Sequence, residues 1–143
     1  KDGVKYYDDS ISTICDTTIQ ALNTLTDADT VLIGGMDRGI DYKDLIEYLS
    51  DSPVPHIILM EATGKRILEE IRSGYPEFLR PERLHPAEHL ADAVETAKAV
   101  TRPGRSCVLS PAAASYGIFK NFEERGDAFG RLVFGADFGG KTD

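Results

Sequence analysis

The segment that most resembles a chemical motif is GADFGGKT, at positions 135–142 near the end of the chain. The phosphate-loop pattern G-x-x-x-x-G-K-[ST] is matched by Gly135, Gly140, Lys141 and Thr142. Such a loop binds phosphate when it joins a strand to a helix, because the first N–H groups of that helix hold the anion. Here the preceding AFGRLV has a helical pattern, and a single residue follows the motif. We therefore interpret the match as accidental and expect no working phosphate loop.

Three other segments are rich in glycine, hydroxyl and small residues, and each follows a run that is typical of a β-strand. They are DDSISTICDTT (8–18), GGMDRGID (34–41) and SPAAASYGIFKNF (110–122). In open α/β sheets, ligands bind outside the carboxyl ends of the strands. These three segments are therefore the candidate binding segments of the chain.

The first segment offers hydroxyl groups and carboxylates ahead of a predicted helix. Ser10, Ser12 and Thr13 are suited to an anionic ligand at a helix start. A carboxylate at this strand end, that of Asp8 or Asp9, can accept a hydrogen bond from a ribose hydroxyl. The same residue types also cap helices that bind no ligand, so both interpretations remain open from the sequence.

The second and third segments offer groups that hold a carboxylate. Gly34 and Gly35 allow a ligand to approach the backbone, and Arg38 has the planar fork that pairs with a carboxylate. Ser115 and the backbone around Phe122 can donate to an anion. The alternative is a glycine turn beside a solvated arginine, with small residues that let a helix pack closely on the sheet.

Strand and helix patterns alternate along the chain, which predicts a Rossmann-like three-layer α/β domain with a mostly parallel sheet and helices on both faces. Strands are expected within 3–9, 30–35, 54–60 and 106–110, and a short one in the proline-broken stretch 75–88. Helices are expected at 17–25, 41–51, 64–74, 89–100 and 121–133. Asp41 is the expected N-cap of the second helix. The runs EE and EER are typical of solvated helix faces.

The composition limits the class of protein. The 143 residues suit a single domain, and the formal net charge of −8 argues against a general nucleic-acid binder. We find no membrane-spanning run and no signal-peptide pattern, so a cytoplasmic location is expected. Cys15 and Cys107 are expected to be reduced, partly buried thiols. Three scattered histidines without partners at ligand spacing predict no metal site.

Three stretches resemble the C-terminal domain of the Mur ligases, and most closely the branch that adds D-glutamate: YYDDSISTICDTTIQAL, VLIGGMDRGIDYKDL and LSPAAASYGIFKNFEERGDAFGRLV. The last is similar to the SPA-x-AS…FKNFE-x-RG signature of that branch, which is far more specific than any short motif. The resemblance runs from about residue 3 to residue 133. We therefore assign 1–133 to this amino-acid-binding domain and 134–143 to a tail that lies outside it.

This resemblance implies a cytoplasmic, three-domain enzyme of peptidoglycan synthesis. ATP would phosphorylate the carboxylate of UDP-N-acetylmuramoyl-L-alanine, and D-glutamate would attack the resulting acyl phosphate. The N-terminal domain would hold the UDP-sugar, and the central domain would carry the phosphate loop and the Mg²⁺ sites. The isolated chain is therefore expected to be inactive and to contain no catalytic or metal-binding residue. The implied D-glutamate contacts are Thr13, Arg38, Ser115 and the backbone of Phe122, and the implied nucleotide contact is Asp9.

The chain departs from the family pattern in its first segment, where DDSISTI replaces the common NDSKATN. Ile11 replaces the lysine of that motif, and Asp8 adds a negative charge near the proposed anion site. Arg38 occupies a position where many members have lysine. The positive charge is kept, but a planar guanidinium with several donors replaces a compact ammonium group. Other hypotheses remain: a related Mur or folylpolyglutamate-type ligase, a preference for L-glutamate, or a non-catalytic Rossmann-like module that binds a nucleotide or a protein.

Overall fold

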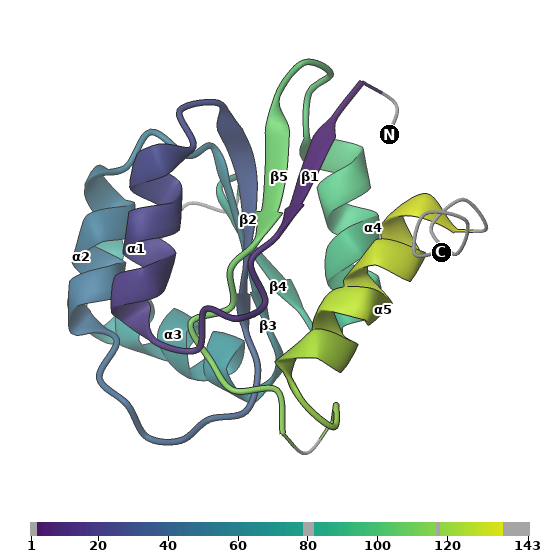
Figure 1. Cartoon of the computed structure of the whole chain (residues 1–143). Coiled ribbons are helices and arrows are strands. Elements are labelled where there is room, and N and C mark those ends of the chain that lie inside the picture. The colour runs from purple at the N-terminus through teal and green to yellow at the C-terminus, as the bar shows by residue number, and fades with distance from the viewer. Residues whose placement is uncertain (1–2, 79–81, 117, 136–143) are drawn as a thin grey trace.

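The computed structural model describes residues 3–78, 82–116 and 118–135, in which strands and helices alternate (Figure 1). The elements follow in the order β1(Lys5–Asp8), α1(Cys15–Thr24), β2(Ala28–Gly34), α2(Lys43–Asp51), β3(His56–Met60), α3(Glu61–Gly74), a 3₁₀ turn (Pro76–Phe78), β4(Leu84–Ala87), α4(Leu90–Val100), β5(Ser106–Leu109) and α5(Phe122–Phe134).

The five strands form one sheet in the order β1-β5-β2-β3-β4. All four pairs of neighbouring strands are parallel. One isolated antiparallel bridge, between Met36 and Ala114, lies beyond the strand ends. Every residue of β2 is buried, as expected for a parallel strand that is covered on both faces.

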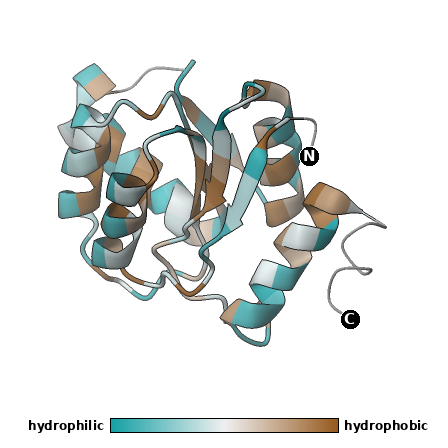
Figure 2. Ribbon diagram, turned by 45° about the horizontal axis from the view of Figure 1, so that its top comes forward, coloured by the Kyte–Doolittle hydropathy of each residue, from teal (hydrophilic) through white to brown (hydrophobic). Residues whose placement is uncertain are grey.

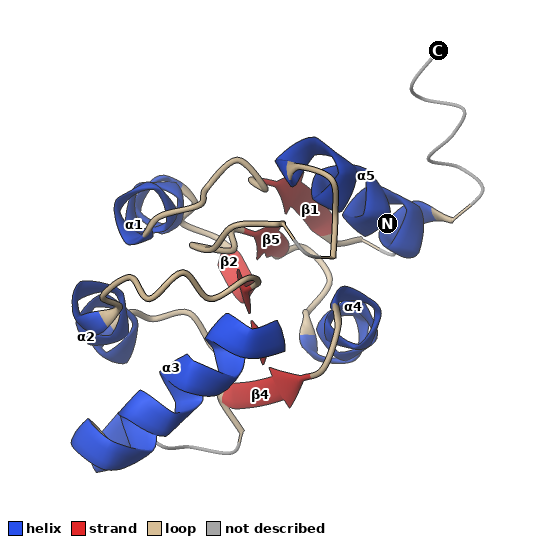
Figure 3. Ribbon diagram, turned by 90° about the horizontal axis from the view of Figure 1, so that it is seen from below, coloured by secondary structure: helices blue, strands red, loops and turns tan. Residues whose placement is uncertain are grey.

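Helices cover both faces of the sheet, which completes the predicted three-layer α/β fold. α1, α2 and α3 lie on one face, and α4 and α5 lie on the other (Figures 1 and 3). The apolar sides of the helices and the central strands face each other (Figure 2). Three side chains of α2, Leu45, Ile46 and Leu49, are buried in the core on the first face.

Some predicted helix starts were wrong. α3 begins at Glu61, directly after β3 and before the predicted Gly64, and Glu61 has a φ of 59°. α2 begins at Lys43 and has no side-chain cap. The predicted N-cap Asp41 instead accepts a hydrogen bond at Oδ1 from the N–H of Lys43, over 2.9 Å. An Asx turn therefore replaces the expected cap.

The strand order sets the place where a ligand can bind. β5 lies between β1 and β2, although it follows both in sequence. The loop after β2 leads to α2 on one face, and the loop after β5 leads to α5 on the other. Such a switch point opens a crevice at the carboxyl ends of the strands. Figure 3 looks onto this edge, where the loops after β1, β2 and β5 converge.

Cys15 and Cys107 are both free and buried, as predicted. Burial raises the pKa of the Cys15 thiol to about 11 and that of the Cys107 thiol to about 12.

No helix in the described part of the chain has the length and apolar character needed to cross a membrane. α5 runs to Phe134, one residue into the predicted tail, and the rest of the phosphate-loop match beyond Gly135 lies outside the described residues.

Candidate functional site

A hollow of about 240 Å³ lies at the carboxyl ends of the strands. Its lining residues are Ile11, Thr13, Arg38, Ala114, Ser115, Tyr116 and Phe122. They come from the loops after β1, β2 and β5 and from the start of α5. The four residues that were predicted as D-glutamate contacts thus lie around one hollow, although up to 109 positions separate them in sequence (13 to 122).

The polar groups of this hollow are largely available to a ligand. Arg38 is exposed and donates one hydrogen bond, from Nη2 to the carbonyl oxygen of Thr13 over 3.1 Å. Among the described residues, no group pairs with the hydroxyls of Thr13 or Ser115. Phe122 is the first residue of α5, so its N–H has no partner within the helix. The residues that line the hollow therefore carry a guanidinium, two hydroxyls and a helix-start N–H, and groups of these kinds can bind a carboxylate.

The hydroxyl residues after β1 do not cap α1. The N-cap position of that helix is Ile14, and it makes no side-chain capping bond. Ser12 donates instead to Asp9, and Ser10 donates to the carbonyl oxygen of Phe122 over 2.7 Å. The capping interpretation of this segment was therefore wrong.

Asp9, the predicted nucleotide contact, lies next to the hollow and joins the exits of β1 and β5. Its Oδ2 accepts hydrogen bonds from the hydroxyls of Ser12 and Ser110, over 2.5 and 2.6 Å. Its Oδ1 has no partner among the described residues, and the residue is half-buried. One carboxylate oxygen is thus held in place while the other can accept a further hydrogen bond.

Gly34, the last residue of β2, and Gly35, which follows it, serve packing rather than ligand access. A methyl group on Gly34 would lie 2.0 Å from the carbonyl oxygen of Met60. One on Gly35 would lie 2.5 Å from the carbonyl oxygen of Ala114. Both have a positive φ, 136° and 157°. We expected these glycines to let a ligand approach the backbone. In the structure, the space beside them is instead filled by other parts of the fold.

Asp8 lines a neighbouring hollow and not the one that Arg38 lines. That second hollow, also about 240 Å³, is lined by Asp8, Ser10, Ile11, Phe122, Glu123 and Asp127. Burial, together with the charges of Asp127 and Asp9, raises the pKa of Asp8. Ile11 and Phe122 line both hollows and so separate the acidic one from the one that contains the guanidinium.

One residue beneath the site was missed by sequence reasoning. Arg125 belongs to the EER run that was predicted to face solvent, but its side chain is fully buried. It donates to Ser10 twice, from Nε to Oγ over 2.9 Å and from Nη2 to the carbonyl oxygen over 2.8 Å. No local pattern distinguishes it from an exposed arginine, because its partner is 115 positions away.

Other features lie apart from this edge. A larger hollow, of about 770 Å³, lies near the amino end of β3, around Ser52, Tyr75 and Arg83. His56 pairs through Nδ1 with Nε2 of His85 over 3.0 Å. Within the described residues, no group of three or more His, Cys, Asp or Glu side chains could hold a metal ion.

The fold and the site define a Rossmann-like α/β domain with a hollow at its switch point that Arg38, Thr13 and Ser115 line. No protein-family model matches the chain. It is related, however, to curated enzymes named UDP-N-acetylmuramoylalanine–D-glutamate ligase. It is 40% identical over 132 residues to the one from Symbiobacterium thermophilum, 36% over 133 residues to that from Caldanaerobacter subterraneus and 35% over 133 residues to that from Chlamydia caviae.

These alignments cover 92–93% of this chain but only 28–30% of the relatives. The chain thus spans less than a third of the length of the curated relatives it matches. The resemblance to the D-glutamate branch of the Mur ligases is confirmed over nearly the whole chain.

Proposed function

We propose that this chain is the C-terminal, amino-acid-binding domain of a cytoplasmic ligase that adds D-glutamate to UDP-N-acetylmuramoyl-L-alanine in peptidoglycan synthesis. The observation that carries the proposal is the convergence of Thr13, Arg38, Ser115 and Phe122 on one hollow. The names of the related enzymes support the choice of D-glutamate as the amino acid.

In the proposed reaction, the γ-phosphoryl group of ATP passes to the carboxylate of UDP-N-acetylmuramoyl-L-alanine and gives an acyl phosphate and ADP. The amine of D-glutamate then forms the C–N bond, the C–O bond to phosphate breaks, and phosphate and a proton are released. This chain would hold the amino acid for that attack. Thr13 and Ser115 would donate hydroxyl hydrogen bonds, Phe122 its N–H, and Arg38 a charged fork that fixes a carboxylate.

The nucleotide contact proposed for this domain is Asp9. Hydrogen bonds from Ser12 and Ser110 fix its Oδ2, and its Oδ1 can accept from a ribose hydroxyl of ATP. The phosphates and Mg²⁺ would be held by other parts of the ligase, since no described cluster of this chain suits a metal ion. For that reason the 143-residue chain alone would not turn over ATP.

The rest of the ligase would cover the site during reaction. Two large apolar side chains that line the hollow are exposed, Ile11 (64%) and Tyr116 (59%), and so is Met36 (42%), whose backbone pairs with that of the lining residue Ala114. A gathering of exposed apolar groups next to a binding site is typical of a surface that contacts another part of a protein. Covering it would exclude water and strengthen the interaction of Arg38 with its carboxylate.

The test is phosphate release by the full-length ligase with ATP, Mg²⁺ and UDP-N-acetylmuramoyl-L-alanine, and with D- or L-glutamate. We expect release that depends on D-glutamate. In Arg38→Ala, kcat/KM for D-glutamate should fall by about 10- to 100-fold, since a charged hydrogen bond is lost. Arg72→Ala is the matched control, because Arg72 is an exposed arginine on α3 far from the hollow. Release with neither isomer would refute the proposal, and release with L-glutamate alone would change its substrate.

A further inference from the structure

Among the residues that the structure describes, Arg125 has the largest fully buried side chain. It lies in the first turns of α5, three positions after Phe122, and it points back beneath the ligand-facing edge. Two of its nitrogens are used on a single residue of the loop after β1: Nε donates to Ser10 Oγ and Nη2 to Ser10 O. This fork fixes both the side chain and the backbone of Ser10.

Ser10 passes this constraint on to the hollow. Its hydroxyl accepts from Arg125 and donates to the carbonyl oxygen of Phe122 over 2.7 Å. Phe122 lines the hollow and starts α5. Arg125, Ser10 and Phe122 therefore form a relay that holds the loop after β1 against the first turn of α5.

The guanidinium also lies against the loops after β2 and β5. A methyl group on Gly35 would lie 3.0 Å from Arg125 Nη1 and 2.5 Å from the carbonyl oxygen of Ala114. The same carbonyl accepts a hydrogen bond from the N–H of Met36 over 2.9 Å. Gly35 comes three residues before Arg38, and Ala114 comes directly before Ser115. Arg125 thus lies beneath every segment that contributes to the hollow.

Stability of the domain does not explain an arginine at this place. Burial lowers the pKa of Arg125 to about 10, against the opposing influence of Glu61 and Asp8, so the buried group is still charged at neutral pH. Arg125 Nη1 and Glu61 Oε2 have no hydrogen-bond partner among the described residues. Apolar side chains of similar volume are often as stabilising as buried charges, or more so. The fork geometry is what an apolar residue cannot supply.

We propose that Arg125 is a positioning residue for the amino-acid site, which acts through Ser10 on Phe122. This inference rests on the proposed function. It does not extend to the nucleotide contact, because the bonds that hold the Asp9 carboxylate come from Ser12 and Ser110 and involve neither Arg125 nor Ser10.

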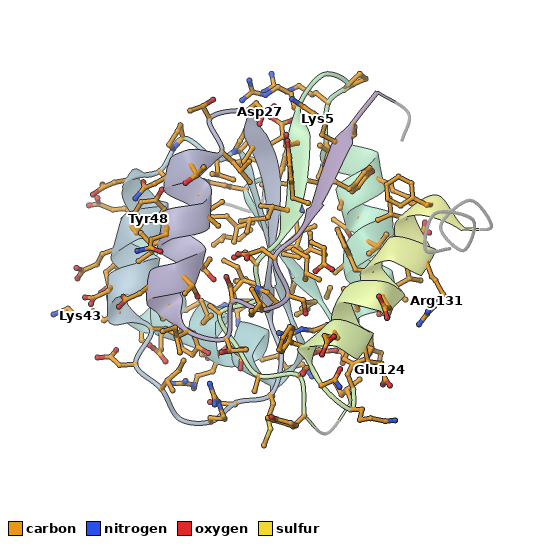
Figure 4. The ribbon with its side chains drawn as sticks, in the orientation of Figure 1. Lys5, Asp27, Lys43, Tyr48, Glu124 and Arg131 are labelled. Carbon is orange, nitrogen blue, oxygen red and sulfur yellow. The ribbon has the colours of Figure 1, made fainter. Side chains whose placement is uncertain are left out.

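The experiment uses the full-length ligase and its Ser10→Ala, Arg125→Met and double variants, with phosphate release measured against D-glutamate and against ATP. Loss of one or two positioning bonds should raise the KM for D-glutamate by about tenfold, with a smaller change in kcat and no change in the KM for ATP. The control is Arg131→Met, because Arg131 is exposed on the same helix and projects from its outer side (Figure 4).

A purely structural role predicts a different result. It would lower the melting temperature and the amount of active enzyme, and hence the apparent kcat, while leaving the KM for D-glutamate unchanged, which would overturn the inference. A relay also predicts that the double variant is no worse than Arg125→Met, because both changes remove one connection. If Arg125→Met does not fold, Ser10→Ala decides alone by its KM for D-glutamate. A wild-type enzyme without D-glutamate-dependent release would instead refute the proposed function, and this inference with it.

Discussion

The Nη2 atom of Arg38 lies 3.1 Å from the carbonyl oxygen of Thr13 and donates a hydrogen bond to it. The two residues are 25 positions apart and follow different strands, β1 and β2. The cation of the candidate site is therefore bonded to the backbone of a residue that carries one of its hydroxyls before any ligand binds. Since β5 separates β1 from β2 in the sheet, this bond spans the switch point itself.

The Thr13 hydroxyl should act on the substrate and not on the fold. Because it has no partner among the described residues, Thr13→Val removes only a potential ligand bond. We expect the KM for D-glutamate of the full-length ligase to rise by about three- to tenfold, with an unchanged melting temperature. Thr17→Val is the control, since Thr17 Oγ1 bonds only to the nearby carbonyl of Ile14, over 3.0 Å. Equal kinetics in the two variants would contradict the role of Thr13.

Two glycines of α3 should respond oppositely to alanine. A methyl group on Gly64 would lie 2.5 Å from the carbonyl carbon of Leu59, so Gly64→Ala would push α3 away from β3. We expect a loss of about 1–3 kcal/mol in the free energy of unfolding, as for other overpacked sites. Gly74 has no atom within 4 Å of the same position, and Gly74→Ala should be neutral or stabilise the helix by up to about 1 kcal/mol. Urea unfolding of both variants tests the contrast, and similar midpoints would contradict it.

Asp29 should stabilise the domain above the acid range. Its buried carboxylate accepts three hydrogen bonds from Arg102, over 2.8–3.0 Å, and a further one from Arg105. The Arg102 bonds lower the pKa of Asp29 to about 2, from an ordinary value of 3.8. The unfolded chain therefore binds a proton more readily than the folded chain between these values, and stability falls as the pH drops through that window.

Asp29→Asn is the variant that tests this stabilisation. At pH 7 it should cost about 1–3 kcal/mol of unfolding free energy, because charged hydrogen bonds are lost. The difference from wild type should shrink towards pH 2, where the wild-type carboxylate also becomes neutral. Melting temperatures at pH 7, 4 and 2 measure it, with the exposed Asp51→Asn as control. A difference that does not vary with pH would rule out the carboxylate charge as its origin.

The pair of His56 and His85 should make the stability of the domain depend on pH between about 5 and 7, above the range in which Asp29 acts. Burial, reinforced by the nearby His56, lowers the pKa of His85 below its ordinary value of 6.5. As the pH falls from 7 to 5, the unfolded chain takes up this proton first, so the folded state loses stability. His85→Gln should reduce the loss between these two pH values, measured by thermal unfolding. An unchanged slope would show that the pair does not contribute.

Much of the fold followed from local patterns. The predicted strands 30–35, 54–60 and 106–110 overlap β2, β3 and β5, because continuous apolar runs bounded by turn residues are distinctive in parallel sheets. Helix starts were predicted less well. α3 begins at Glu61, and no polar N-cap residue in the sequence indicates this start. The chain turns directly from strand to helix because Glu61 itself has a left-handed backbone conformation.

The sequence by itself determined the residue types of the candidate site and their order along the chain. Hydroxyl residues, an arginine and a turn of small residues follow three strand patterns. The similarity of these segments to the Mur ligases can be recognised from the sequence alone. Local chemistry suffices for this, because strand exits in parallel sheets share one edge.

Only the tertiary structure decided which groups meet and which are buried. Placing β5 between β1 and β2 brings Ser110 to Asp9, gathers Thr13, Arg38 and Ser115 on one hollow and leaves Asp8 in another. It also buries Arg125, which the sequence pattern predicted to face solvent. The physical reason is that such contacts join residues about a hundred positions apart, and no local periodicity encodes the packing that desolvates a charge.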